Sequence, residues 1–496
     1  VQPRTLEVLT GLGVAAARVE RGNPAVRLQM HSGTRTTEVP LFDIGLADTA
    51  YPFLLFLSQA ETEAILDEHL AQRGATVERG VELIDLRQQP DRVACTLRQH
   101  SGRTEEVEAR YVVGCDGAHS SVRSHAGIGF TGSAYPQTFV LADTDADGLD
   151  PGAAHVYLSG AGMMFFFPLA HPAAWRLLGM QPPADKHNQA GEEPPDLAQL
   201  QALADSYTAA RIRLRDPVWT TYFHLHHRHA TSYRTGRVFL AGDAAHIHSP
   251  AGAQGMNTGI QDAWNLGWKL ALVAKGVANP ALLDTYQTER QPVGRYVLRV
   301  TDRAFVVATS TNPLIRLLRT HVAPRLLQLA LGFARGRALG FRAVSQLAIQ
   351  YRSSPAVQEG HPRLGRGPRA GDRLPDAPVT VDGQPQTLHQ ALAAPRFHLL
   401  LAGPTDSWPA DDASVLGDRC ARALEVHRLT LDARSGSLVD VRGHAHRRLG
   451  LDRTDHTGHY LIRPDLHIAY RAAGTNLTGL RNHLNRWLPG DPALTG

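Results

Sequence analysis

Cysteine is scarce in this sequence. Of 496 residues only three are cysteines, Cys95, Cys115 and Cys420, and they lie far apart in the chain. Their number and spacing exclude a disulfide framework and a zinc site built from cysteines. So few cysteines are typical of proteins from a reducing compartment, and we therefore predict a cytoplasmic protein.

Long apolar runs and blocks of one charge are also missing. No uninterrupted apolar run approaches the length of a membrane span, and we expect no signal peptide. The net charge is only +4, and no lysine or arginine block stands out, so the sequence predicts neither membrane insertion nor nucleic-acid binding. A content of 43% hydrophobic and 20% charged residues is ordinary for a globular protein, and the length allows two or three domains.

A nucleophile triad and a pair of catalytic carboxylates are absent too. The one cluster that suggests a metal is the histidine-rich run from His224 to His229. Strand alternation would place His224 and His226 on one face, where they could bind zinc. No carboxylate or further histidine at a ligand spacing completes that site, so we predict no metal.

The sequence does contain one long informative stretch, Gly236 to Gly276. Its apolar run Val238–Ala241 predicts a buried strand, and Asp243 follows directly. A loop of small residues then leads to a helix for which Asn257 and Thr258 are the expected caps. The buried face of this helix is expected to carry Ile260, Trp264, Gly267 and Ala271.

Such a unit brings a carboxylate at the end of a strand close to the N-terminus of a helix. The carboxylate can accept hydrogen bonds from sugar hydroxyls, and the helix N-terminus stabilises an anion. Crevices beyond the carboxyl ends of parallel strands bind cofactors in α/β proteins. The stretch therefore predicts a cofactor site.

Residues 242–271, GDAAHIHSPAGAQGMNTGIQDAWNLGWKLA, resemble the second flavin-binding motif of the class A flavoprotein monooxygenases, the para-hydroxybenzoate hydroxylase-like aromatic hydroxylases. The resemblance implies that Asp243 contacts the ribityl chain of FAD and that Pro250 lies beside the isoalloxazine. It also implies that the helix start faces the N1–C2=O edge of the flavin, where a helix N-terminus would stabilise the reduced form. The residues of that helix start are Gly255, Met256 and Asn257. An ordinary strand–loop–helix unit is the alternative.

Two further segments carry the resemblance. Ser58-Gln-Ala-Glu61 predicts a capping box at the start of a helix, and the family implies a flavin contact for Gln59; a plain capped helix is the alternative. Residues 111–123, YVVGCDGAHSSVR, resemble the Asp-Gly motif of the family, which places Asp116 near the FAD pyrophosphate. Arg123 is then the expected anion partner, because a guanidinium can grip phosphate oxygens. An aspartate cap beside a surface arginine is the alternative.

The first residues resemble the segment that follows the first βαβ unit of the family. Pro3 to Leu9 has proline near a helical start and leucines at helical spacing, and we place Arg4 among the cofactor-binding candidates. The βαβ unit itself, with its Gly-x-Gly-x-x-Gly motif, is not found. Neither Gly11-Leu-Gly13 nor Gly365-Arg-Gly367 lies between a strand and a helix as the motif requires. The sequence is therefore expected to be a fragment, a mis-started reading frame or a natural truncation.

The fold class that the resemblance implies is α/β, with three parts. They are a Rossmann-like FAD/NAD(P)-binding domain without its N-terminal βαβ unit, an inserted β-sheet substrate domain, and a thioredoxin-like C-terminal domain as in the polyketide, phenol and rifampicin monooxygenases. Cys420 has no Cys-x-x-Cys partner, which excludes dithiol chemistry in that last domain. The expected boundaries are 1–135 with 222–290 for FAD binding, 136–221 for the substrate sheet, 291–352 for a helical segment, 353–378 for a linker and 379–496 for the C-terminal domain. Within these parts the residue pattern predicts helices over 313–331 and Phe341–Tyr351, a strand over Phe397–Leu401, and a hairpin that pairs the segment from Tyr460 with the segment that ends at Tyr470.

The implied function is FAD-dependent hydroxylation of an aromatic, polyketide-like small molecule with NAD(P)H and O2, through a flavin C4a-hydroperoxide. NAD(P)H is expected to bind transiently, because no second dinucleotide motif is present. Met164, Phe166 and Trp219 are the substrate-pocket candidates, and a homodimer is compatible with this function. Two alternatives stay open: an antibiotic-inactivating flavin monooxygenase, and a truncated relative that is unable to hold FAD.

Overall fold

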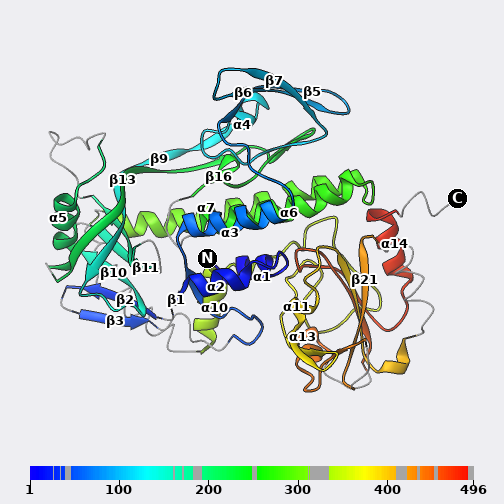
Figure 1. Cartoon of the computed structure of the whole chain (residues 1–496). Helices are drawn as coiled ribbons and strands as arrows, with labels where there is room; N and C mark the ends of the chain where they lie inside the picture. Colours follow the sequence, from blue (N-terminus) through cyan, green and yellow to red (C-terminus); the bar gives the residue numbers. More distant parts are fainter. Residues whose placement is uncertain are drawn as a thin grey trace.

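Two long helices cross the middle of the molecule, with a large sheet near either end. The computed structural model describes residues 1–25, 27–33, 35–39, 46–159, 162–169, 173–181, 193–209, 211–248, 254–310, 312, 334–408, 422–432, 436–451 and 456–489. The long helices are α6 (Gly255–Ala274) and α7 (Asp284–Thr309). Figure 1 shows them between a β-rich part at the left and the C-terminal domain at the lower right.

The strand of the Gly236–Gly276 stretch is the middle strand of a small sheet. β15 (Val238–Leu240) pairs in parallel with β8 (Val112–Gly114), and β14 (Arg234–Thr235) pairs with its other edge. All three residues of β15 are fully buried, as the apolar run predicts for a strand covered on both faces. The other described elements outside the two large sheets are α1 (Pro3–Thr10), α2 (Ala15–Arg21), β1 (Asn23–Ala25), β4 (Leu54–Phe56), α3 (Gln59–Gln72), β5 (Val81–Gln88), β6 (Val93–Gln99), β7 (Thr104–Ala109), α4 (Ser121–His125), η1 (Gly242–Ala244), η2 (Pro280–Leu283) and α10 (Ala334–Val344).

An eight-stranded sheet forms the β-rich part. Helix α5 (Leu197–Thr208) packs on one of its faces, and the end of α7 contacts the other through Phe305. The sheet is wider than the predicted segment 136–221, because two strands from before that segment complete one edge. Its strands, in spatial order, are β16 (His246–Ile247), β13 (Arg213–Ala230), β9 (Phe130–Asp147), β12 (Trp175–Met180), β11 (Gly162–Pro168), β10 (Ala153–Ser159), β2 (Arg27–Ser32) and β3 (Arg35–Val39).

The C-terminal domain is built on a second eight-stranded sheet. Helices α11 (Leu388–Ala391) and α13 (His444–Leu449) pack on one face, and α14 (Thr478–Trp487) packs on the other. The strands, in spatial order, are β17 (Gln358–Glu359), β24 (Ile468–Ala473), β23 (Gly458–Ile462), β20 (Phe397–Ala402), β21 (Leu424–Thr430), β22 (Leu438–Val439), β18 (Pro378–Val381) and β19 (Gln384–Thr387), and a short η4 (Thr405–Ser407) follows β20.

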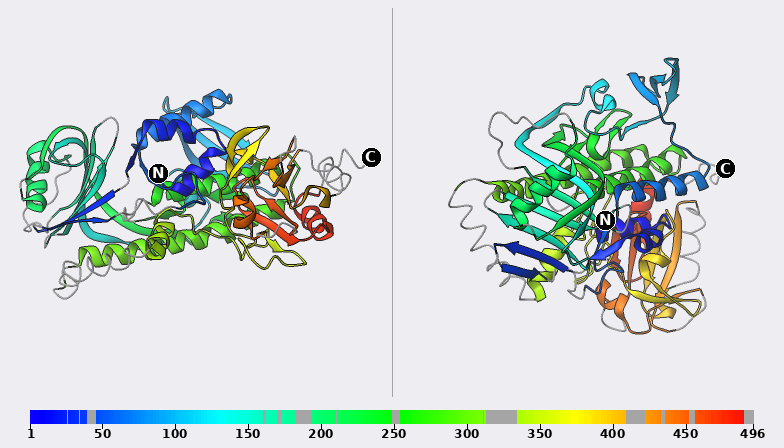
Figure 2. Two further views of the ribbon diagram at one scale, coloured as in Figure 1. Left: turned by 90° about the horizontal axis from the view of Figure 1, so that it is seen from below. Right: turned by 60° about the vertical axis from the view of Figure 1, so that its left-hand side comes forward.

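One apolar core joins the C-terminal domain to the central helices. Trp268 of α6 meets Phe397 of β20 edge to face, with ring centroids 5.5 Å apart. The same core continues through β15 and β8 on one side and α14 on the other. The two views in Figure 2 also show the C-terminal domain against the central helices. The two parts are therefore packed together through a continuous core.

Several predicted elements are confirmed. The predicted helix at Ser58, the strand at Phe397 and the hairpin of Tyr460 and Tyr470 are present as α3, β20 and the β23–β24 pair. The predicted helix Phe341–Tyr351 is wrong, because α10 ends at Val344. The predicted helix 313–331 lies outside the described residues. None of the described helices combines the length and apolar character that a membrane span needs.

Candidate functional site

The loop after β15 lies directly against the first turns of α6. Gly242 has φ +61, and a Cβ placed on Gly259 would come within 3.3 Å of the Gly242 Cα. Glycine suits both positions, because the left-handed φ of Gly242 would strain any other residue and a Cβ on Gly259 would be tight against the loop. The Gly242 N–H also donates to Asp262 Oδ2 at 3.2 Å. This contact fixes the position of the next residue, Asp243, beside α6.

Helix α6 begins at Gly255, as the resemblance implies, and its N-cap lies three residues before the expected cap Asn257. Its N-cap is Gln254, and within the described residues no side chain caps the helix, so the prediction that Asn257 and Thr258 are caps is wrong. Asn257 is buried, and its Oδ1 accepts the backbone N–H of Gln2 at 2.8 Å. Gly255 has open space where a side chain would stand. Among the described residues the start of α6 thus has no side-chain cap, and the helix dipole places partial positive charge there.

Asp243 offers a carboxylate to a ligand. The side chain is exposed, and it has no hydrogen-bond partner among the described residues. Burial of its surroundings nevertheless raises the pKa of Asp243, with a further rise from Asp262 and an opposing effect from His246. An exposed carboxylate without a partner among the described residues is suited to accept hydrogen bonds from hydroxyl groups.

Asp116 and Arg123 both lie close to this loop, but their polar groups are already in use. Asp116 accepts hydrogen bonds from the Ser120 hydroxyl at 2.5 Å and from the Val122 N–H at 3.0 Å. Arg123 is buried and donates to the Ala244 carbonyl at 3.0 Å and to another backbone carbonyl. The expected phosphate grip of Arg123 is therefore not what the structure shows. Arg123 instead ties α4 to the residue after Asp243.

Of the two other cofactor candidates, Gln59 is exposed and Arg4 is buried. Gln59 is exposed at the start of α3 and donates to Glu63 at 3.0 Å. The Ser58 hydroxyl caps this helix as predicted by accepting the Glu61 N–H.

Arg4 is buried, pairs with Glu7 at 3.1 Å and donates to the Asp465 carbonyl of the C-terminal domain. Its guanidinium therefore lies in an interdomain contact, and its cofactor role stays a prediction. Pro250 lies outside the described residues.

A buried network of hydrogen-bonded side chains lies beneath the loop, and the sequence did not predict it. Asp262 receives the Arg290 Nε at 2.6 Å, and its other oxygen lies 2.6 Å from His246 Nε2. The His246 Nδ1 lies 2.8 Å from the His248 Nε2. Burial raises the pKa of Asp262, but Arg290 and His246 outweigh it and leave the pKa below its ordinary value. Burial lowers the pKa of His248 to about 3, so this histidine is neutral at pH 7. The His-x-His spacing was the only signal in the sequence.

The aromatic run of β11 has two faces with different surroundings. Met164 and Phe166 are fully buried beneath α5, and their role in a substrate pocket stays a prediction. Phe165 and Phe167 point to the opposite face, because side chains alternate along a strand. Trp219 is 48% exposed. Phe167 pairs with Arg176, Arg176 with Asp143, and Asp143 with Trp219 across neighbouring strands. Because directly paired residues share a face of the sheet, Trp219 lies on the same face as Phe167.

Two known families match this chain. The family described as "FAD binding domain" matches residues 1–301, and the one described as "Aromatic-ring hydroxylase, C-terminal" matches residues 367–492. The chain belongs to the FAD-binding aromatic-ring hydroxylases. This hydroxylase is 36% identical over 520 residues to 6-methylpretetramide 4-monooxygenase of Streptomyces rimosus, an alignment that covers 99% of this chain and 87% of that protein.

Solved structures agree with this membership. OxyS anhydrotetracycline hydroxylase from Streptomyces rimosus has a TM-score of 0.75 at 27% identity, over 98% of this chain and 90% of that one. Aklavinone-11 hydroxylase, solved as a ternary complex with FAD and aklavinone, has a TM-score of 0.76 at 25% identity, over 98% and 91%. The predicted family, the FAD cofactor and the monooxygenase activity are therefore confirmed.

The described residues of this hydroxylase fit the flavin end of FAD. The open carboxylate of Asp243 can accept hydrogen bonds from a ribityl chain, and the uncapped start of α6 with the open space at Gly255 suits an electron-rich ring edge. The pyrophosphate end has weaker support, because the candidates Asp116 and Arg123 have protein partners.

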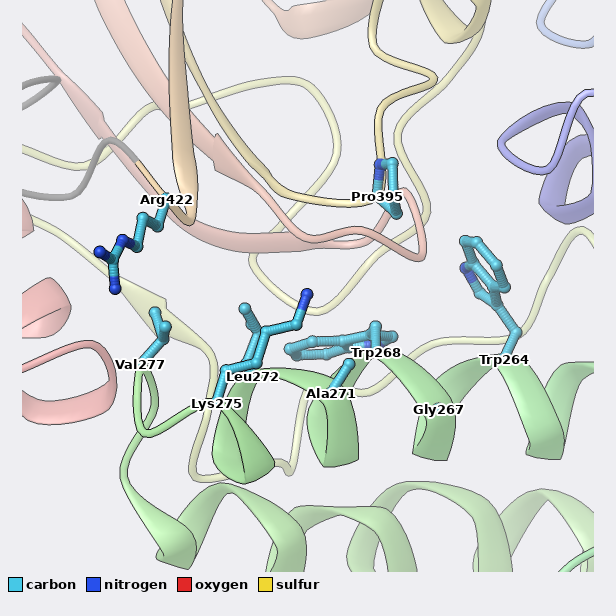
Figure 3. A pocket seen from close by; sticks show the side chains of 9 residues that line it. All are labelled: Trp264, Gly267, Trp268, Ala271, Leu272, Lys275, Val277, Pro395 and Arg422. Carbon is cyan, nitrogen blue, oxygen red and sulfur yellow. The ribbon is translucent and has the colours of Figure 1, made fainter. Parts of the chain in front are cut away.

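A groove of about 700 Å³ lies along the later turns of α6 in this hydroxylase. Figure 3 shows Trp264 and Trp268 on α6 below Pro395, with Arg422 of the C-terminal domain at the other end. None of the predicted site residues lines this groove. It is therefore separate from the helix start and from Asp243.

Proposed function

We propose that this hydroxylase oxygenates a fused-ring, polyketide-like aromatic substrate that lies on the Phe167 face of the eight-stranded sheet. The observation that carries the proposal is the aromatic and apolar character of that face. Its members form one cluster with the end of α7: Tyr135, Phe139, Leu141, Phe165, Phe167, Leu178, Met180, Phe223 and Phe305. Phe165 and Phe167 are only half-buried within this cluster, so a flat apolar ring system can bury its faces against them.

Polar groups on the same face can orient the substrate. Arg176 binds Asp143 through two hydrogen bonds of 2.7 and 2.8 Å, and the strand register places this pair between Phe167 and Trp219. A paired guanidinium is rigid and keeps donors that can meet a substrate hydroxyl or carbonyl. The exposed ring of Trp219 would cover one edge of the substrate. The names of the related 6-methylpretetramide and anhydrotetracycline enzymes support a polyketide-like substrate class.

In this proposal the protein binds FAD, orients the substrate and shields the reacting ring from water. Bound FAD supplies the redox chemistry with O2, with NAD(P)H as the transient reductant. Asp243 would hold the flavin end, and the α6 N-terminus would stabilise negative charge on the ring. Gly255, Met256 and Asn257 contribute that helix start. The aromatic face excludes water from the reacting ring.

The C-terminal domain would have a structural part in this enzyme, and we assign it to the thioredoxin-like class. Support comes from the strand order β21-β20-β23-β24, in which β20 is parallel to β21 and antiparallel to β23, with α14 following β24. We further propose the domain limits given by the sequence, with β2 and β3 added to the substrate sheet.

Titration with FAD tests the flavin end of this proposal. The Asp243→Asn variant should bind FAD about ten- to a hundredfold more weakly, because it loses charge-assisted hydrogen bonds worth about 1.5–3 kcal/mol. The matched control is Asp216→Asn, an exposed aspartate on β13. Equal affinity of the Asp243→Asn variant and the original chain would contradict the role of Asp243.

Steady-state kinetics test the substrate face. With a panel of fused-ring polyphenols, the Trp219→Ala variant should raise KM at least about fivefold, because a covering aromatic ring is worth about 1 kcal/mol or more. The control is Thr220→Ala, since Thr220 neighbours Trp219 but points to the α5 face. An unchanged KM in the Trp219 variant would place the substrate elsewhere. NAD(P)H oxidation without oxygenation of any aromatic compound in the panel would contradict the proposed substrate class.

A further inference from the structure

Three side chains with metal-ligand atoms meet on the C-terminal sheet, in a region that the flavin chemistry does not use. They are His398 of β20 and Glu425 and His427 of β21, and Figure 1 labels β21 within this domain. The two strands run parallel, and His398 pairs directly with Glu425. Glu425 and His427 are two residues apart on one strand, so all three side chains project from the same face.

The donor atoms of these residues lie close together. His398 Nδ1 lies 2.9 Å from His427 Nε2. The Glu425 carboxylate lies 3.9 Å from the first of these nitrogens and 3.7 Å from the second. Tetrahedral ligands at about 2.0–2.1 Å from zinc are about 3.3–3.4 Å apart, and the observed separations fall on both sides of that value. Small side-chain rotations would therefore complete three corners of a tetrahedron.

A backbone hydrogen bond fixes the tautomer of His398, as is usual for histidines that bind metals. His398 Nε2 lies 2.9 Å from the Ala394 carbonyl, so it carries the proton and leaves a lone pair on Nδ1. A neutral imidazole with a lone pair directed at the site is the form that binds metals.

We propose that His398, Glu425 and His427 form a binding site for one zinc-class divalent cation. Two imidazoles and one carboxylate match the preference of Zn²⁺, and the half-buried position of Glu425 and His427 leaves the fourth corner for water. In the metal-free chain the His427 Nε2–H donates to His398 Nδ1. Binding moves that proton to His427 Nδ1 and directs the Nε2 lone pair to the metal, with no net release from the rings.

The site would act as a clamp within the C-terminal domain. It joins the first residues of β20 to those of β21 at the end of the sheet where Arg396 approaches Glu425 at 4.0 Å. Among the described residues no other group of three such ligands is this close together. The cation would compensate the Glu425 charge more closely than Arg396 does. The expected consequence is a domain that unfolds at a higher temperature when zinc is present.

Calorimetric titration of the untagged, chelator-treated full chain with Zn²⁺ tests the proposal. The original chain should bind one equivalent, and His427→Gln and Glu425→Gln should each weaken binding more than about tenfold. Zinc should raise the thermal unfolding midpoint of the original chain and not that of either variant. The matched control is His31→Gln, because His31 and His155 form a second histidine pair, 3.1 Å apart, that lacks a carboxylate ligand.

The outcomes distinguish zinc binding at the proposed site from nonspecific zinc binding elsewhere on the surface. Retention of one-equivalent binding by the His31 variant, with loss in the two site variants, supports the clamp. Equal zinc affinity in all four proteins would overturn it, and so would zinc binding without a shift of the unfolding midpoint. Circular dichroism shows whether each variant is folded, so a loss of binding cannot be confused with a loss of structure. FAD affinity serves as an independent readout and should not change.

Discussion

Replacing Glu289 by Gln should loosen the contact between the C-terminal domain and the central helices. Glu289 of α7 is buried and accepts five hydrogen bonds of 2.6–2.8 Å. Two come from Arg463 of the β23–β24 turn, and one comes from Lys269 of α6. Asp465 provides the second negative charge by pairing with Arg463 at 2.6 Å. The four charges balance, so removing one leaves an excess positive charge in the interior.

The expected cost follows from that imbalance. Breaking a buried ion pair by removing one partner costs about 3–5 kcal/mol, because the remaining charge stays desolvated. Lys269 limits the loss, since burial lowers its pKa to about 8, despite the opposing effect of Glu289. Neutralising such a lysine at pH 7 costs about 1.4 kcal/mol. Its folded pKa lies below its unfolded value, so the unfolded chain holds more protons and stability rises with pH above about 8. In the Gln variant the loss of Glu289 lowers the pKa of Lys269 further, so the stability of the variant begins to rise at a lower pH than that of the original chain, and the deficit should shrink between pH 7 and pH 8.

Denaturant unfolding followed by tryptophan fluorescence measures this cost. Trp268 is a suitable reporter, because Arg463 lies over its ring at 5.2 Å and Phe397 contacts its edge. The double variant Glu289→Gln/Lys269→Met restores the charge balance and should recover part of the loss. The exposed pair of Arg215 and Asp147 provides a control, and Asp147→Asn should leave the unfolding midpoint unchanged. A Glu289→Gln variant within about 1 kcal/mol of the original chain, or with a deficit that grows with pH, would refute the reasoning.

Two more stability predictions follow from helix α6 and from α14. Gly259→Ala should destabilise the chain by about 1–3 kcal/mol and weaken FAD binding, because the new Cβ meets Gly242 at 3.3 Å. Gly267→Ala on the same helix has open space and should stabilise by up to about 1 kcal/mol, so thermal unfolding that ranks the two alike would contradict the packing argument. Burial, with a smaller effect from Arg486, lowers the pKa of His483 to about 4, so its contribution to stability is lost as pH falls from about 6.5 to 4. Unfolding of His483→Gln between pH 7 and 5 should therefore show a slope smaller by up to about 1.4 kcal/mol per pH unit, and an unchanged slope would contradict this assignment.

Local patterns in the sequence predicted the elements whose signals are contained in short segments. The apolar run of β15, the Ser58 cap of α3 and the hairpin of β23 and β24 depend on neighbours within a few residues, and each is present. The start of α6 was misplaced, because Asn257 looks like a cap from sequence alone. Its side chain is used by Gln2, which is 255 residues away along the chain.

The buried face of α6 shows most clearly where pattern reasoning fails. Apolar spacing favoured a face that includes Gly267 and Ala271, yet both are exposed, whereas Asp262 and Lys269 are fully buried. Hydrophobic periodicity assumes that charges face water. Here Arg290 and Glu289 pair with the buried charges from another helix, and only the tertiary structure brings these partners together.

The sequence alone predicted the family, the flavin cofactor and the class of reaction, because residues 242–271 form one contiguous motif that resembles a known flavin-binding segment. The tertiary structure decided which side chains are free to act. Arg123 has its donors occupied by backbone carbonyls, and Phe166 faces α5 while Phe167 faces the other side. Whether a polar group has a partner, and which face of a sheet is covered, depends on contacts between distant segments. Such contacts cannot be predicted from the local pattern of residues.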